Sequence, residues 1–134
     1  MILDTSAIMA ILRDEPEART FLEAMSSAET LRLSAGTWLE LTVVTTRAAE
    51  KEIGEAAGTI LERFGVVIEG VTKEIAMIAN IAYRRYGRGS GHEADLNFGD
   101  CFAYALAKAS GEPLLFKGQD FSRTDVIPAI PLQA

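Results

Sequence analysis

Met1-Ile2-Leu3-Asp4-Thr5-Ser6 opens this chain of 134 residues and gives the strongest indication of its fold. Three apolar residues lead into an acid and two hydroxyl residues, and the apolar segment 7–12 follows. The pattern predicts a buried strand that ends at Asp4 and a helix that begins at Thr5 or Ser6, because hydroxyl side chains favour helix N-termini. A strand without polar alternation is typical of a parallel sheet covered on both faces. Asp4 would then stand at the carboxyl edge, where such sheets bind ligands, or it would only cap the helix.

Strand-like and helix-like segments alternate along the rest of the chain. Further short strands are predicted at 30–34, 66–69, 114–116 and 126–129. Helices are predicted at 14–25, from Ser34 or Thr37 to residue 44, and at 51–64, 72–86 and 98–109. Pro128 favours an edge position for the last strand, because proline cannot donate a ladder hydrogen bond. This order predicts a single α/β domain over residues 1–134, with a mostly parallel central sheet.

Composition argues against several classes of protein. No apolar stretch approaches the roughly 20 residues that span a bilayer, and an acid at position 4 with no basic region before it argues against a signal peptide. Cys101 is the only cysteine, so no intramolecular disulfide can form, and a reduced, cytoplasmic setting is the simplest interpretation. The net charge of −6 argues against generic polyanion binding. It does not exclude a nucleic-acid enzyme whose acids bind metal ions, since bound cations invert the local charge.

Four acids occupy positions that a parallel sheet could bring together. Asp4 and Asp120 follow predicted strands, Asp100 lies in the first turn of a helix, and Glu40 lies near the start of another. Clustered carboxylates repel one another, so such a cluster needs raised pKa values or bound cations. Hard oxygen ligands suit Mg²⁺ or Mn²⁺. Two such ions about 3.5–4 Å apart could clamp the attacking and leaving oxygens of a phosphodiester.

Each acid also has a purely structural interpretation. Asn97 and Asp100 have the spacing of a capping box, in which an acid three residues after the cap bonds back to the backbone. Asp120, close to Gly118, fits an ordinary Asx-turn. Glu40 could simply point to solvent. Spacing alone specifies no metal site, so both interpretations stay open.

Three longer segments carry more information than the single residues. They are MILDTSAI at 1–8, LNFGDCFAYALA at 96–107 and LLFKGQDFSRTD at 114–125. Together they resemble, in order and from end to end of the chain, the motifs of VapC-type PIN-domain ribonucleases, which are toxins of type II toxin–antitoxin systems. The resemblance implies a PIN-like three-layer α/β/α domain. It also implies a Mg²⁺-dependent endoribonuclease that hydrolyses RNA phosphodiesters.

The resemblance further implies catalytic roles for the four acids. Asp4 and Asp100 would be the principal metal ligands and Glu40 the acid that completes the set. Asp120 would be the fourth acid, acting through water or from outside the ligand shell. No attack by a ribose hydroxyl is required, so His92 is interpreted as a histidine of a surface loop rather than as a general base.

Two polar residues near the acids match supporting positions of the family. Ser6 would position Asp4, and Asn97 would be a polar neighbour of the site, although both could serve only as helix caps. One departure stands out, because the family loop commonly reads His-Pro-Ala-x-Leu-Asn and residues 92–97 here read HEADLN. The extra acids Glu93 and Asp95 could repel RNA or narrow its choice.

An RNA substrate would need cationic side chains, and five are candidates for phosphate contacts: Arg84, Arg85, Arg88, Lys117 and Arg123. The first two could instead only complement the dipole at the end of their helix. The resemblance also implies a VapB-like antitoxin that blocks the acidic site, and a homodimer. The lack of a long apolar stretch predicts no membrane partner.

Two other classes of function fit part of the pattern. An aspartate-based phosphatase or phosphoacceptor would use Asp4, but Ser6 stands where such a phosphatase needs a second acid. A non-catalytic PIN-like nucleic-acid-binding module would need no intact acid set, whereas all four acids are present. A nuclease with another target is a variant of the first interpretation, because the sequence does not distinguish transfer RNA, ribosomal RNA and DNA.

Overall fold

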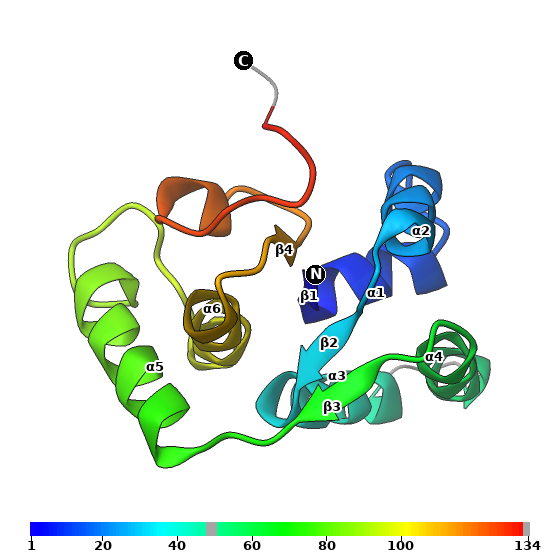
Figure 1. Ribbon diagram of the computed structural model, residues 1–134, viewed down its shortest axis with the longest axis horizontal. Coiled ribbons are helices and arrows are strands. Elements are labelled where there is room, and N and C mark those ends of the chain that lie inside the picture. The colour runs from blue at the N-terminus through cyan, green and yellow to red at the C-terminus, as the bar shows by residue number, and fades with distance from the viewer. Residues whose placement is uncertain (48–50, 133–134) are drawn as a thin grey trace.

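The computed structural model describes residues 1–47 and 51–132, in which strands and helices alternate (Figure 1). The strands are β1 (Ile2–Leu3), β2 (Arg32–Ser34), β3 (Val67–Glu69) and β4 (Leu114–Leu115). The helices are α1 (Thr5–Leu12), α2 (Ala18–Ser27), α3 (Ala35–Arg47), α4 (Lys51–Arg63), α5 (Lys73–Tyr86) and α6 (Phe98–Ser110), followed by the short 3-10 helix η1 (Phe121–Arg123). The predicted alternation of strands and helices is therefore confirmed.

All four strands pair in parallel, in the order β3-β2-β1-β4. The chain steps from β1 to β2 and β3 on one side and then returns to place β4 on the other side of β1. The direction of winding therefore reverses at β1, and this switch point is where open α/β sheets form their ligand crevice. Asp4 follows β1 directly, so the fold places it at the expected edge.

Alternate side chains of the short strands pack into two separate apolar layers. Ile2 and Leu114 pack with residues of α5 and α6, whereas Leu3, Leu33 and Leu115 pack with residues of α1, α2, α3 and α4. Figure 1 shows α5 and α6 to the left of the sheet and α1, α2 and α4 to its right. The sheet is thus the middle of three layers, as predicted. None of the helices in the described ranges is long and apolar enough to cross a membrane.

Two predicted elements differ from the structure. The segment 126–129 is not a strand but forms an isolated parallel bridge between Leu114 and Pro128, although this bridge does lie at the sheet edge beside β4. The helix predicted from Asp14 begins only at Ala18. Asp14 has a φ of 50°, a left-handed conformation that cannot continue into a right-handed helix.

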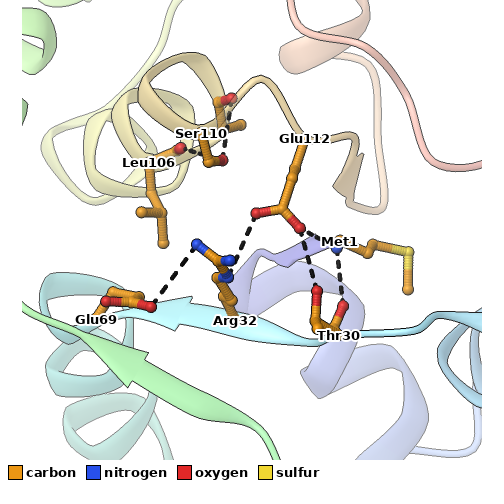
Figure 2. A network of polar contacts seen from close by, with 8 residues as sticks. Met1, Thr30, Arg32, Glu69, Leu106, Ser110 and Glu112 are labelled. Atoms are coloured by element: carbon orange, nitrogen blue, oxygen red, sulfur yellow. Dashed lines mark hydrogen bonds and ion pairs between the residues drawn. The ribbon is translucent and has the colours of Figure 1, made fainter.

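A polar network ties together the amino-terminal edge of the sheet (Figure 2). The Met1 ammonium group donates to the Thr30 carbonyl at 2.9 Å and to Glu112 Oε1 at 2.8 Å. Arg32 lies between two acids, with its Nε 3.5 Å from Glu112 Oε2 and its Nη1 3.8 Å from Glu69 Oε1. These contacts join the beginnings of β1 and β2 to the turn before β4. The Met1 and Glu112 contacts lie at the edge opposite Asp4, whereas Glu69 is the last residue of β3.

The buried layer predicts a contrast between two leucines. Leu33 is 0% exposed in β2, whereas Leu39 is 58% exposed in α3. Leu33→Ala should lower the free energy of unfolding by about 2–5 kcal/mol, because it removes apolar contacts and leaves a cavity. Leu39→Ala should change it by less than about 0.5 kcal/mol. Urea denaturation measures both, and similar losses for the two variants would contradict this assignment of the core.

Candidate active site

Asp4 occupies a buried position between the ends of β1 and β4. Its Oδ2 accepts hydrogen bonds from the Ser6 backbone N–H at 3.0 Å and from Ser6 Oγ at 2.6 Å, which caps α1. Ser6 Oγ in turn accepts a bond from the Lys117 backbone N–H at 3.0 Å. The other carboxylate oxygen, Oδ1, is buried without a hydrogen-bond partner. Because an unsatisfied buried polar atom is costly, this oxygen marks a position that a cation would complete.

Burial is also the main reason why the pKa of Asp4 is unusual for an aspartate. Desolvation raises its pKa to about 6, against the opposing effect of the hydrogen bonds from Ser6, and the neighbouring charge of Glu40 raises it further. In the absence of a compensating cation, the carboxyl group therefore takes up a proton near pH 6, well above the range of an ordinary aspartate.

Asp100 combines a structural bond with membership of the acid cluster. Asn97 Oδ1 accepts from the Asp100 N–H and Asp100 Oδ2 accepts from the Asn97 N–H, both at 2.9 Å, which forms the capping box of α6. Burial raises the pKa of Asp100 to about 7, and the charges of Asp4, Asp120 and Glu40 raise it further. The four predicted acids are therefore neighbours. Capping and clustering are not alternatives for Asp100, since the capping box uses only one of its oxygens.

Glu40 is held by two residues that the sequence did not single out as site residues. Its Oε1 accepts a hydrogen bond from Thr5 Oγ1 at 2.6 Å. Its carboxylate also packs so closely on Gly99 that a Cβ at that position would overlap it. The sequence did contain one signal of this contact, which is Gly99 in the first turn of a helix, directly before Asp100. Glycine destabilises helices, so its presence there indicates close packing by another group.

Asp120 lies at the rim of the cluster. Its side chain is exposed and makes no capping hydrogen bond at the start of η1, although its charge acts on Asp100. Within residues 1–47 and 51–132, no three His, Cys, Asp or Glu side chains already converge closely enough to hold a metal ion. The acids are thus near enough to repel one another without forming a closed shell. The unpartnered Asp4 oxygen and the raised pKa values fit a cation that takes oxygen ligands.

Three of the five predicted RNA-binding cations are paired with acids, and two of these, Lys117 and Arg123, stand near Asp120 in the sequence. Lys117 forms an ion pair with Glu15 and lies 3.2 Å from Glu17, and the hydrogen bond to Glu15 raises the pKa of Lys117. Arg123 Nη1 lies 3.0 Å from Glu93 Oε2. Both cations stand three residues from Asp120 in the sequence, and neither is an unpaired charge.

The other three cations lie at or after the end of α5. Arg88 Nε is 3.8 Å from Asp95 Oδ2, and the Arg85 guanidinium lies 4.8 Å from the centre of the Tyr86 ring. Arg84 and Arg85 are exposed in the last turn of the helix, where positive charge also complements the dipole. The structure therefore leaves both sequence-based interpretations of this pair open.

A family model described as PIN domain matches residues 1–127. The chain belongs to the PIN-domain family. Ribonuclease VapC28 of Mycobacterium tuberculosis is 48% identical over 130 residues, which cover 97% of this chain and 98% of that protein. Ribonuclease VapC42 of the same species is 46% identical over 129 residues, covering 96% and 98%. This PIN-domain chain is thus of the VapC type, as the resemblance implied.

Solved structures of low sequence identity share the fold. M. tuberculosis VapC20, described as a sarcin–ricin loop cleaving toxin, superposes with a TM-score of 0.73 at 19% identity and covers 94% of this chain and 95% of its own. A toxin–antitoxin complex from Klebsiella pneumoniae superposes with a TM-score of 0.71 at 18% identity and covers 98% of both chains. These likenesses agree with the three-layer parallel architecture of this PIN domain.

The raised pKa values predict how the metal-free PIN domain responds to pH. A carboxyl group whose pKa is higher in the folded state contributes stability below its unfolded value, near 3.8, and loses that contribution as pH rises through the folded value. The free energy of unfolding in EDTA should therefore fall between pH 5 and pH 8, as Asp4 and Asp100 ionise. Each pKa unit corresponds to about 1.4 kcal/mol.

Urea denaturation at the two pH values measures this effect. Asp100→Asn is the matched variant, since it keeps a similar side-chain shape without the ionisation. A decrease as large in Asp100→Asn as in the unchanged protein would show that Asp100 is not one of its sources.

Proposed function

We propose that this PIN domain is a metal-dependent endoribonuclease toxin that uses Mg²⁺, or Mn²⁺, to hydrolyse RNA phosphodiesters. The observation that carries the proposal is the buried Oδ1 of Asp4, which has no hydrogen-bond partner. The charge of Glu40 raises the pKa of Asp4, and the charge of Asp4 raises the pKa of Asp100, so the three carboxylates lie close together. The names of the VapC relatives, which are ribonucleases, support RNA as the substrate class.

Asp4, Asp100 and Glu40 would hold the cation. When bound there, a divalent ion would stabilise negative charge on the phosphate and lower the pKa of a coordinated water. The protein's own contribution is positional. The hydrogen bond from Ser6 orients Asp4, and the hydrogen bond from Thr5 orients Glu40, whose carboxylate packs on Gly99. Such fixed orientation matters because misplacement by about 1 Å can cost a hundredfold in rate.

Asp120 and His92 differ in their freedom to act on water. Asp120 is exposed at the rim and makes no capping bond, so its carboxylate is available to orient a water molecule beside Asp100. His92 Nδ1 accepts a hydrogen bond from the Ala94 N–H at 3.0 Å, and its ring packs edge-on against Tyr86. The histidine is therefore engaged in the loop structure, which agrees with a mechanism that works through carboxylates.

We further propose that a VapB-like antitoxin controls the toxin in the cytoplasm. The likeness to a toxin–antitoxin complex of Klebsiella pneumoniae supports such a partner. Clustered carboxylates without a compensating cation would attract a cationic side chain from the partner, which would exclude metal and RNA together. A homodimer and the choice between transfer RNA and ribosomal RNA stay predictions from the resemblance.

Cleavage of total cellular RNA by the purified, antitoxin-free protein tests the nuclease proposal. Discrete fragments should appear with Mg²⁺ and disappear with EDTA. Asp4→Asn should lower the cleavage rate by at least about a hundredfold, because it removes the charge that the cation needs. Circular dichroism should show that this variant keeps its fold. Equal cleavage by the variant and the unchanged protein would remove Asp4 from the site.

A second test separates the support of Glu40 from general damage to a helix. Gly99→Ala adds a methyl group where the Glu40 carboxylate lies, whereas Gly58→Ala adds one in α4 where nothing lies within 4 Å. Gly99→Ala should reduce cleavage by on the order of a hundredfold and raise the Mg²⁺ concentration needed for half-maximal rate. Gly58→Ala should leave both unchanged and stabilise the helix by up to about 1 kcal/mol. Matching activities in the two variants would argue against the Glu40–Gly99 contact.

A further inference from the structure

The loop between α5 and α6 is closed at its base by backbone hydrogen bonds. Gly87 and Leu96 form a parallel bridge, in which the Arg88 N–H donates to the Leu96 carbonyl at 3.0 Å and the Leu96 N–H donates to the Tyr86 carbonyl at 2.9 Å. Within the loop, the Asp95 N–H donates to the His92 carbonyl at 3.2 Å. These bonds give the loop a defined conformation.

Alternate residues of this loop face opposite ways. Ala94 and Leu96 are fully buried in the apolar layer formed with α5 and α6. Glu93 and Asp95 are exposed. The buried residues anchor the loop, so the two acids project from a fixed base rather than from a mobile segment.

Each of these acids forms an ion pair with an arginine. Glu93 Oε2 lies 3.0 Å from Arg123 Nη1 as a hydrogen-bonded ion pair, and Asp95 Oδ2 lies 3.8 Å from Arg88 Nε. Arg123 follows Asp120 by three residues in η1, whose Phe121 is buried in the same apolar layer as Ala94 and Leu96. The Glu93–Arg123 pair thus joins two anchored segments beside the fourth acid.

We propose that Glu93 is an internal competitor for substrate phosphate at Arg123. The proposal rests on the ribonuclease function proposed above and concerns how RNA gains access to the same site. An RNA phosphate and the Glu93 carboxylate are both anionic acceptors for one guanidinium group, so a phosphate must compete with Glu93 for Arg123 Nη1. Glu93 therefore lowers the affinity for RNA and leaves the carboxylate cluster untouched.

Glu93 and Asp95 differ in how closely each contacts its arginine. The Glu93–Arg123 contact is at hydrogen-bond distance, with Arg123 41% exposed and Glu93 71% exposed. The Asp95–Arg88 contact is longer, with Arg88 64% exposed and Asp95 65% exposed. The two carboxylates are similarly exposed, so it is the shorter distance and the less exposed arginine that reduce the screening of the Glu93–Arg123 pair. Asp95 therefore competes in the same way but with a smaller effect.

Binding of a fluorescent single-stranded RNA to the full chain tests the proposal, with EDTA present so that the RNA stays intact. Glu93→Gln should tighten binding about two- to fivefold at low salt, the range expected for removal of an exposed ion pair. The slope of the logarithm of affinity against the logarithm of salt concentration should also become more negative, by up to about 0.7. The reason is that Arg123 then neutralises one more phosphate without first giving up Glu93. With Mg²⁺, KM should fall by a similar factor and kcat should not change.

Two controls isolate the contact from the change of net charge. Glu29→Gln makes the same change at an exposed position before β2, at the opposite edge of the sheet, and should leave the affinity unchanged. In an Arg123→Gln background, Glu93→Gln should lose its effect. Asp95→Asn should give a smaller gain than Glu93→Gln.

Each outcome decides the matter. Equal affinities for Glu93→Gln and Glu29→Gln, or an undiminished Glu93→Gln effect without Arg123, would overturn the proposal. So would a lack of measurable RNA binding by every variant, since a freed Arg123 would then contact no phosphate. If no RNA is cleaved but the Glu93→Gln effect on binding appears, the competitor stands and the nuclease proposal falls.

Discussion

The Ser6 hydroxyl group is the constraint on which the site depends. It donates to Asp4 and accepts from the backbone N–H of Lys117, so one oxygen atom joins the carboxyl ends of β1 and β4. The Asp4 N–H continues the same pairing by donating to the Leu115 carbonyl at 3.0 Å. Because Ser6 occupies only Oδ2, the second carboxylate oxygen is held in the interior without a partner. The fold thus orients Asp4 before any ligand is bound.

Two of the acids contribute to the fold as well as to the cluster. Asp4 caps α1 and Asp100 closes the capping box of α6, each through Oδ2. Caps of this kind typically stabilise a helix by about 1 kcal/mol. That gain offsets part of the cost of burying carboxylates whose pKa values rise to about 6 and about 7. The arrangement explains how a PIN domain can keep neighbouring acids in its interior and still fold.

The surface around the cluster explains how an acidic chain could act on a polyanion. The net charge is −6, yet Lys117 and Arg123 stand on either side of Asp120. Their acidic partners come from distant segments, Glu15 and Glu17 before α2 and Glu93 in the loop before α6. Positive charge is thus present at the rim but shared with carboxylates. Under the proposed function, RNA phosphates would compete with the protein's own acids for these cations.

The sequence by itself determined the alternation of elements, the strand that ends at Asp4 and the acid in each motif, because apolar periodicity and capping residues act over a few neighbours. Only the tertiary structure decided that Thr5 and Gly99 hold Glu40, and that Glu93 pairs with Arg123. Each of these contacts joins residues that are 30 or more positions apart in the sequence. It also replaced the strand predicted at 126–129 by a single bridge. Local patterns specify which residues can form an element, whereas contacts between elements depend on how the layers pack.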